Sequence, residues 1–164
     1  MKLTFGGNPI TVLGNEVKVG DKAKSFSLLK NDLSEATLED YEGKIKLLNI
    51  VPSLDTGLCD AQTRRFNKEL NNREDIVVVT VSNDLPFAQA RWCGNAGLEN
   101  VITLSAHRDE LFGTDYGVLI KELRLLARSV IILDKNNIVT YVEYVTEGTN
   151  HPNYETALSH LNSK

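Results

Sequence analysis

The chain has few cysteines, few prolines and few aromatic residues, and it lacks any long hydrophobic run. Its 164 residues include two Cys, four Pro and 7% aromatic residues. Two cysteines are too few for a disulfide scaffold or a cysteine-rich zinc site, and no Cys-x-x-Cys pair occurs. The longest apolar runs, such as Ile76–Val79 and Val130–Leu133, are far short of the ~20 residues that span a bilayer. These absences exclude a disulfide-rich, a zinc-ribbon and a membrane-spanning protein.

An excess of positive charge is also missing. The net charge is −4 and the isoelectric point is near 5.4, with charges of both signs scattered along the chain. Such a balance argues against a nucleic-acid groove and against an anionic membrane surface as partners. Gly6, Gly7, Asn8 and Pro9 interrupt the N-terminal apolar residues, so we expect no secretory signal. The expected location is the cytoplasm, where a disulfide is more often transient and catalytic than structural.

The size and composition that remain are those of an ordinary globular protein. Hydrophobic residues make up 41% of the chain, and a length near ~150 residues corresponds to one domain. Such a chain buries enough surface to fold without a metal or a disulfide. No internal repeat, low-complexity segment or linker is visible. We therefore expect residues 1–164 to form a single domain.

The N-terminal part reads as short strands separated by turns. The turns fall at Gly6-Gly7-Asn8 and Gly14-Asn15, and together with the flanking apolar residues they predict an N-terminal β-hairpin. Thr37 is the expected N-cap of a helical turn that ends at Tyr41. The strands expected here are Leu3–Phe5, Ile10–Leu13, Glu16–Val19 and Phe26–Leu29.

The central part predicts a strand, a crossover helix and a second, parallel strand. Lys46–Val51 and Ile76–Val81 are strongly apolar, as is typical of strands covered on both faces. Cys59–Asn71 between them reads as a helix, with Ala61, Phe66 and Leu70 on or near one face. This order is a βαβ unit with a right-handed connection.

The C-terminal half continues the alternation and then closes with a hairpin and a helix. Tyr154, Ala157, Leu158 and Leu161 form the apolar stripe of the last helix. The whole order predicts an α/β, thioredoxin-like fold with a mixed central sheet flanked by helices. The elements expected here are helix Pro86–Cys93, strand Val101–Leu104, helix Glu110–Tyr116, strands Ser129–Asp134 and Ile138–Val145, and helix Pro152–Leu161.

Cys59 stands where such a fold places its chemistry. It follows a buried strand and begins a helix, at the edge of the sheet where open α/β sheets bind ligands. The N–H groups and the partial positive charge of a helix N-terminus favour a thiolate. A free cysteine is roughly 3% thiolate at pH 7, so full ionisation gains at most ~30-fold. Other groups must therefore stabilise the transition state.

The sequence offers three such groups. Thr56 lies three residues before Cys59, Pro52 is able to shield the site from water, and Arg128 precedes a core strand. Each has a plain alternative reading, because Thr56 suits a helix N-cap, Arg128 suits a surface cation, and a lone cysteine is most often a small buried hydrophobe.

Acidic residues next to Cys59 stand against a reactive thiolate. Asp55 and Asp60 flank the cysteine, and a nearby carboxylate disfavours a thiolate. We expect these carboxylates to point away or to pair, Asp60 with Arg64 four residues later. Arg64 and Arg65 otherwise read as a solvated helix face.

Cys93 lies near the end of the helix that starts at Pro86, next to Trp92. Both cysteines follow core strands of one sheet, so we expect both toward the same edge of it. A disulfide needs Cα atoms within about 7 Å, and cysteines on separate helices rarely start that close. Bonding would then require one helix end to unwind, which Gly57 and Gly94 would ease.

These residues resemble a specific family. Pro52-x-x-x-Thr56-x-x-Cys59 matches the peroxiredoxin signature, and the segments at 52–59 and 84–93 look like the thiol peroxidases, the atypical two-cysteine type. Segments 100–105 and 126–128 also resemble that family. One departure is Lys24, which replaces the usual Pro of the segment that begins at Gly20. It concerns a loop remote in sequence from both cysteines.

The resemblance implies an enzyme and a role for each residue. Cys59 would be oxidised by hydrogen peroxide or an organic hydroperoxide to a sulfenic acid, and Cys93 would condense with it to an intrachain disulfide that thioredoxin reduces. Thr56 and Arg128 would be polar partners of the sulfur and the peroxide oxygens, and Pro52 would shield them. The family implies a homodimer and no cofactor.

Other functions remain open at this point. A thioredoxin-like disulfide reductase shares the fold, but it needs Cys-x-x-Cys, and Thr56 stands at the first position. A redox sensor would use the same disulfide to change shape for a partner. A metal enzyme is disfavoured because His107, His151 and His160 lack ligand spacing, and no glycine-rich phosphate loop is present. We therefore expect no metal.

Overall fold

The computed structural model describes residues 1–97 and 101–163. Within these residues, seven strands form one mixed sheet in the order β11-β10-β6-β7-β8-β4-β5. β6, β7 and β8 run parallel, and their neighbours on both sides pair antiparallel. The strands are β4 (Ser27–Leu29), β5 (Glu35–Thr37), β6 (Ile45–Ile50), β7 (Ile76–Ser82), β8 (Ile102–Ser105), β10 (Ser129–Leu133) and β11 (Val139–Tyr144).

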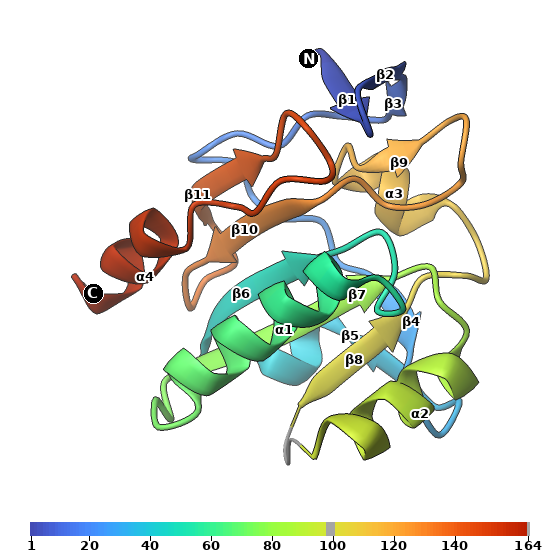
Figure 1. Cartoon of the computed structure of the whole chain (residues 1–164). Helices are drawn as coiled ribbons and strands as arrows, with labels where there is room; N and C mark the ends of the chain where they lie inside the picture. The colour runs from blue at the N-terminus through green and yellow to red at the C-terminus, as the bar shows by residue number, and fades with distance from the viewer. Residues whose placement is uncertain (98–100, 164) are drawn as a thin grey trace.

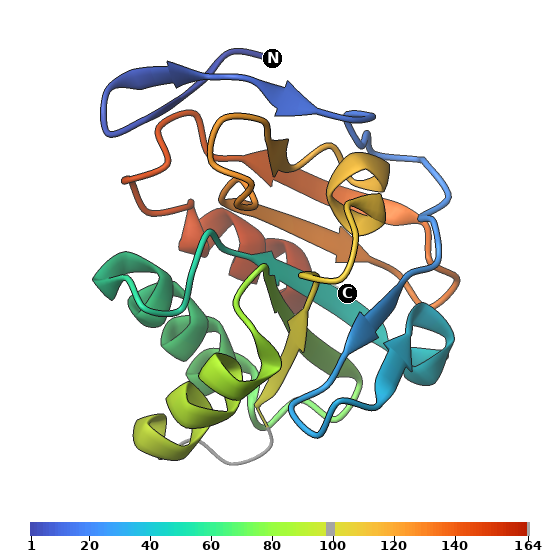
Figure 2. The same cartoon turned by 90° about the vertical axis from the view of Figure 1, so that its right-hand side faces the viewer.

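Helices cover both faces of this sheet. In Figure 1, α1 and α2 lie in front of the sheet and α4 packs beside α1. Figure 2 shows α3 and the 3-10 helix η1 on the opposite side. The predicted thioredoxin-like arrangement of a mixed sheet flanked by helices is therefore confirmed. The helices are η1 (Leu38–Tyr41), α1 (Gly57–Leu70), α2 (Pro86–Ala96), α3 (Leu111–Asp115) and α4 (Tyr154–Asn162).

Alternate residues of the central strands belong to two separate cores. Leu47 of β6 packs with Phe66 of α1 and Leu161 of α4. The next residue, Leu48, packs with Phe112 and Tyr116 on the other face. Because side chains alternate along a strand, apolar residues on both faces read as the continuous runs seen in the sequence.

The predicted N-terminal hairpin is confirmed, but the prediction for the residues that follow it is wrong. β1 (Leu3–Phe5) pairs with β2 (Asn8–Ile10), whereas β3 (Val12–Leu13) leaves the hairpin and pairs with β9 (Leu119–Ile120). The expected strand at 16–19 does not form.

Glycine geometry explains why the chain does not fold back on itself. Gly14 has φ +103°, and a Cβ there would lie 2.2 Å from the carbonyl oxygen of Thr114. The N–H of Asn15 donates to that same oxygen at 2.9 Å. The chain is thus fixed to the end of α3, and the N–H of Val17 donates to the Tyr144 hydroxyl at 2.8 Å. Long-range contacts replaced the local hairpin that the Gly-Asn turn predicted.

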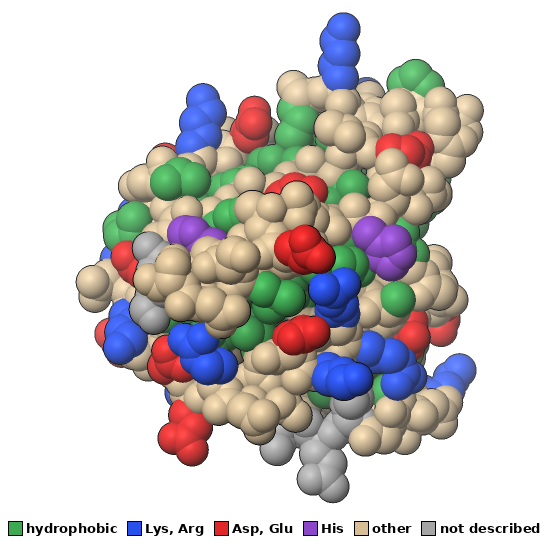
Figure 3. All heavy atoms as spheres, turned by 60° about the vertical axis from the view of Figure 1, so that its left-hand side comes forward, with side chains coloured by type: hydrophobic (Ala, Val, Ile, Leu, Met, Phe, Trp, Pro, Cys, Tyr) green, Lys and Arg blue, Asp and Glu red, His purple; other side chains and the backbone are tan. Residues whose placement is uncertain are grey.

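The surface mixes charges of both signs. On the face shown in Figure 3, Lys and Arg side chains lie interspersed with Asp and Glu. Among the described residues, no helix has the length and apolar character needed to cross a membrane. Within the same residues, no three His, Cys, Asp or Glu side chains gather as metal ligands would.

Candidate active site

Thr56 starts the helix that carries Cys59. Its side-chain oxygen accepts a hydrogen bond from the Cys59 N–H at 3.3 Å, and its hydroxyl donates to the Ser53 carbonyl at 3.1 Å. Thr56 is therefore the N-cap of α1, one of the two roles that the sequence left open. The cap places Cys59 in the first turn of α1, just beyond the carboxyl end of β6.

Arg128 lies against the sulfur of Cys59. Its Nη2 is 3.2 Å from Sγ, its Nη1 donates to Gln62 Oε1 at 2.9 Å, and its Nε donates to the Gly148 carbonyl at 2.8 Å. Arg128 is only 3% exposed and Cys59 is 0% exposed, so the surface-cation reading is wrong. A buried cation is costly unless it is paired and hydrogen-bonded. Here the planar guanidinium is held in one orientation, which suits a sulfur that carries negative charge.

A chain of buried polar side chains continues from Arg128 into the sheet. Gln62 Nε2 donates to Asn49 Oδ1 at 2.6 Å, and Asn49 Nδ2 donates to the hydroxyls of Thr63 and Thr80 at 3.0 and 3.1 Å. Such satisfied networks rigidify a site. Our sequence reasoning missed these residues, although an Asn within the apolar run of β6 was a visible signal.

The buried face of α1 also differs from the one that we expected. Ala61 is exposed, whereas Gln62 and Thr63 are buried together with Cys59, Phe66 and Leu70. The first turns of α1 therefore bury polar groups near the cysteine, and only the later turns bury apolar ones.

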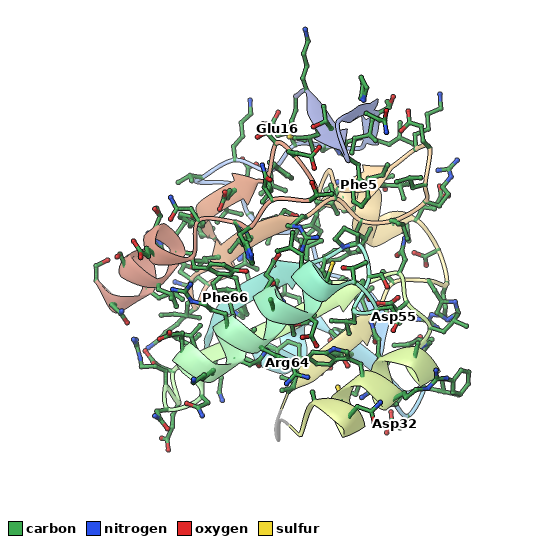
Figure 4. The ribbon with its side chains drawn as sticks, in the orientation of Figure 1. Phe5, Glu16, Asp32, Asp55, Arg64 and Phe66 are labelled. Atoms are coloured by element: carbon green, nitrogen blue, oxygen red, sulfur yellow. The ribbon has the colours of Figure 1, made fainter. Side chains whose placement is uncertain are left out.

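Of the two acidic neighbours of Cys59, Asp60 is paired with other side chains and Asp55 is exposed. Both oxygens of Asp60 bind Arg64 Nε, at 3.0 and 2.9 Å, and Oδ1 also accepts from Trp92 Nε1 at 2.7 Å. Figure 4 shows Arg64 on α1 on the side that faces α2. The predicted pairing of Asp60 with Arg64 is confirmed.

The loop before α1 is tied to β7. The carboxylate of Asp84 accepts from Ser53 Oγ at 2.7 Å, from the Leu54 N–H at 2.8 Å and from Ser82 Oγ at 2.7 Å. Pro52, at the start of this loop, is buried. Asp84 was not singled out from the sequence, although it directly follows the strand next to β6.

Tyr154 of α4 packs against Phe66 of α1, with ring centres 5.3 Å apart. Its hydroxyl lies 2.8 Å from Nδ1 of His151, and the guanidinium of Arg65 lies 4.6 Å from its ring centre. Burial raises the pKa of Tyr154, while Arg128 lowers it and Cys59 raises it further. Tyr154 thus shares the electrostatic environment of the Cys59–Arg128 pair.

Cys93 lies near the C-terminal end of α2 and is half-buried. Its Sγ is 3.7 Å from Asn31 Nδ2 and 3.4 Å from Thr103 Oγ1. Both cysteines are free thiols. They share one small apolar group, which we term the Trp92 cluster. The Trp92 cluster comprises Val51, Leu54, Cys59 and Trp92, with Cys93, Ala96 and Val101 packed against it.

The structure thus brings Cys59, Thr56 and Arg128 together and buries Pro52 in the loop before α1, and it places Cys93 against the same apolar cluster as Cys59 without a bond between the two sulfurs. Of the segment 100–105 that carried part of the resemblance, Asn100 lies outside the described residues.

Known proteins share this fold and this sequence. Residues 18–158 match the Redoxin family. A peroxiredoxin-like protein of Aquifex aeolicus has a TM-score of 0.92 at 37% identity, over 99% of this chain and 96% of its own. The thiol peroxidase of Halalkalibacterium halodurans is 63% identical over 95% of this chain and 94% of its own length. That of Bacillus subtilis is 59% identical over 94% and 92%.

The fold and the family match define a redoxin, and in this redoxin the buried Cys59 sulfur lies beside Arg128. The chain belongs to the redoxin family, in its thiol peroxidase branch.

Proposed function

We propose that this thiol peroxidase reduces hydroperoxides through Cys59. The observation that carries the proposal is the buried Cys59 sulfur 3.2 Å from the Arg128 guanidinium. The thiolate attacks one peroxide oxygen and the O–O bond breaks. The other oxygen takes up a proton and leaves as water or an alcohol. Cys59, oxidised by two electrons, becomes a sulfenic acid.

The surrounding groups act on the charge that moves in this step. Arg128 keeps donors aimed at the sulfur and the attacked oxygen, and its bonds to Gln62 and Gly148 fix it there before reaction. Thr56 caps the helix that presents the sulfur, and its hydroxyl supplies the second polar group near the peroxide. Pro52 has no N–H to attract water and covers the site from the loop side.

Cys93 completes the cycle in this proposal. Its thiol condenses with the Cys59 sulfenic acid, which forms the Cys59–Cys93 disulfide and releases water. Thioredoxin then reduces the disulfide by thiol–disulfide exchange and is itself oxidised. The Trp92 cluster supports this assignment because both sulfurs border the same apolar group. Gly94 follows Cys93 within the last turn of α2, and a glycine inside a helix lowers the free energy needed to unwind that turn.

A coupled assay tests the proposal. The protein is mixed with thioredoxin, thioredoxin reductase and NADPH, and then with hydrogen peroxide or an organic hydroperoxide. We expect NADPH oxidation that depends on peroxide and is lost in Cys59→Ser, which differs by one atom. A rate no higher than this variant with both peroxides would exclude the function. Insulin reduction without peroxide consumption would instead indicate a disulfide reductase.

We also propose a homodimer, with the exposed residues Leu85, Phe87, Leu111 and Leu123 as its surface. The segments that precede α2 and α3 and the loop around Leu123 are joined, because Asn83 Nδ2 donates to the Arg124 carbonyl at 2.7 Å and Arg124 pairs with Glu110 at 3.1 Å. A monomer in sedimentation at micromolar concentration would contradict this. The cytoplasmic location and the single-domain organisation stay predictions.

A further inference from the structure

Cys93 takes part in a closed ring of hydrogen bonds. Thr103 Oγ1 donates to Asn31 Oδ1 at 2.9 Å, and Asn31 Nδ2 donates to Cys93 Sγ at 3.7 Å. Thr103 has one hydroxyl proton, which Asn31 already accepts. In the remaining contact, at 3.4 Å, the Cys93 S–H is therefore the donor to Thr103 Oγ1. Each of the three side chains gives one hydrogen and accepts one, and we term this arrangement the Cys93 ring.

The Cys93 ring fastens the last turns of α2 to the edge of the sheet. Asn31 lies in the loop between β4 and β5, and Thr103 is a buried residue of β8. In Figure 4, Asp32, the neighbour of Asn31, lies beside α2. The ring thus joins α2 to β8, which follows it in the chain, and to a loop 62 residues before Cys93.

The beginning of α2 is fixed by other bonds. Gln89 Nε2 donates to Ser82 Oγ and to the Leu104 carbonyl, both at 2.9 Å. Further along, Trp92 binds Asp60, and Arg64 Nη1 donates to the Ala96 carbonyl at 3.2 Å. Among residues 1–97 and 101–163, the hydrogen bonds of the Cys93 sulfur are those of the ring, and its other contacts are apolar packing against the Trp92 cluster.

We propose that the Cys93 ring is a latch that limits how fast Cys93 leaves α2 to meet the oxidised Cys59. The inference rests on the proposed function. Condensation needs the Cys93 sulfur to give up both partners, because a sulfur that bonds to Cys59 cannot remain in the ring. Asn31 and Thr103 are positioning residues in this step, since neither touches the reacting Cys59.

The latch also sets sensitivity to excess peroxide. A Cys59 sulfenic acid that waits for Cys93 meets a second hydroperoxide, which transfers one oxygen to the sulfur and leaves as water or alcohol. The product is a sulfinic acid, which the thiol–disulfide cycle does not reduce. A tighter latch lengthens the wait and raises the sulfinic fraction.

Thr103→Val tests the latch, with Thr103→Ser as its matched control. Valine keeps the shape of threonine and removes the hydroxyl, whereas serine keeps the hydroxyl. The reduced protein is mixed with hydrogen peroxide, and the fluorescence of Trp92, the single tryptophan, is followed in a stopped flow. Intact mass spectrometry then measures the sulfinic acid formed at high peroxide.

We expect the first phase, oxidation of Cys59, to be the same in all three proteins. The second phase, disulfide formation, is expected to be about fivefold faster in Thr103→Val, which corresponds to one net hydrogen bond. The sulfinic fraction should fall in parallel, and Thr103→Ser should behave as the parent chain. Asn31→Ala, in a half-buried loop position, should likewise speed the second phase and lower the sulfinic fraction. It provides a second test if Thr103→Val folds poorly.

Three results would overturn the latch or its basis, and they differ from one another. An unchanged or slower second phase in Thr103→Val and Asn31→Ala refutes the latch alone. A first phase without any disulfide in the parent chain refutes the role of Cys93 and the latch with it. No first phase at all refutes Cys59 as the attacking residue.

Discussion

The two cysteines lie in opposite kinds of surroundings. Cys59 is fully buried in the first turn of α1 against the cation Arg128, whereas Cys93 is half-buried near the end of α2 in a ring without charge. A helix is partly positive at its start and partly negative at its end. The two sulfurs therefore face opposite electrostatic surroundings, a guanidinium and a helix start at Cys59 and uncharged side chains and a helix end at Cys93.

The bonding differs in the same way. Arg128 is held by a network that runs through Gln62 to Asn49 near the end of β6, so the partner of Cys59 cannot move without disrupting the core. Cys93 is held by two contacts to sulfur, which is a weak donor and a weak acceptor. We infer from this difference that, in the proposed cycle, Cys59 keeps its place and Cys93 moves.

Removing the mobile cysteine should have the largest effect. In Cys93→Ser we expect Cys59 to consume a single equivalent of peroxide at the normal rate and then to stop as the sulfenic acid. Steady-state NADPH oxidation should fall to the level of Cys59→Ser, because serine cannot form a disulfide. Trapping with dimedone and mass spectrometry would detect the sulfenic acid. Full steady-state turnover in this variant would show that Cys93 does not resolve Cys59.

Removing the charge beside the fixed cysteine should have the next largest effect. Arg128→Ala is expected to slow the peroxide step about 100-fold, as the loss of an aimed donor does in other active sites. Arg128→Lys keeps the charge but loses the planar guanidinium, so its rate should lie between that of the parent chain and that of Arg128→Ala. The rate is measured in a single turnover, before Cys93 acts.

Stability separates a catalytic from a structural role for Arg128. The alanine change leaves Gln62 and Gly148 without their donor, which should cost about 2 kcal/mol of unfolding free energy in a urea titration. We expect the rate of the peroxide step to fall by more than the loss of stability can account for. The rate of disulfide formation by Cys93 should stay the same. Equal single-turnover rates in Arg128→Ala and the parent chain would remove Arg128 from the site.

The sequence predicted the parts of the fold that follow from local pattern. The strands β6 and β7, the existence of a helix between them and the apolar stripe of α4 were predicted correctly because each follows from residues close together in the chain. The pairing of β3 with β9 was missed because it joins residues more than a hundred positions apart. The wrong strand at 16–19 arose where the turn residues Gly14 and Asn15 bind α3 instead.

The contacts of the site likewise fall into those that local spacing predicts and those that distant segments make. Asp60 and Arg64 are one helical turn apart, so their pairing was readable from spacing, and Thr56 was readable as the cap of α1. The contacts of Arg128 and of Cys93 come from distant segments, and no spacing rule predicts them. The resemblance supplied the names of Arg128 and Cys93, but not Gln62, Asn31 or Thr103, which hold them.

The smallest effect is expected from a substitution of Glu147, a carboxylate remote from both cysteines. Glu147 is next to Gly148, whose carbonyl binds Arg128. Glu147 accepts from the N–H groups of Gly7 at 2.7 Å and Thr149 at 2.6 Å, and from the Thr149 hydroxyl. These bonds, the one from the Thr149 hydroxyl foremost, lower the pKa of Glu147 to about 2. The adjoining Gly148 carbonyl accepts from Arg128, and a Cβ at Gly148 would lie 2.4 Å from the Phe5 ring. In Figure 4, Phe5 points from β1 toward this part of the molecule. The N-terminal hairpin thus covers the loop that holds Arg128.

Glu147→Gln tests whether this cover matters. A carboxyl with a lowered pKa stabilises the fold above its ordinary pKa near 4.5, and that contribution is lost as the pH falls from there toward 2. The urea midpoint of the parent chain should therefore drop when the pH is lowered from 5 to 3, and this drop should be larger than in Glu147→Gln. The two pH values lie on either side of the ordinary pKa of a glutamate. Glu74→Gln, in an exposed turn, is the matched control and should follow the parent chain. At pH 7, peroxide should oxidise Cys59 about twofold more slowly in Glu147→Gln than in the parent chain, as expected for exposed charged contacts. The rate of disulfide formation by Cys93 should stay the same. A slower Cys93 phase with normal Cys59 oxidation would show that the hairpin acts on the mobile cysteine rather than on the fixed one.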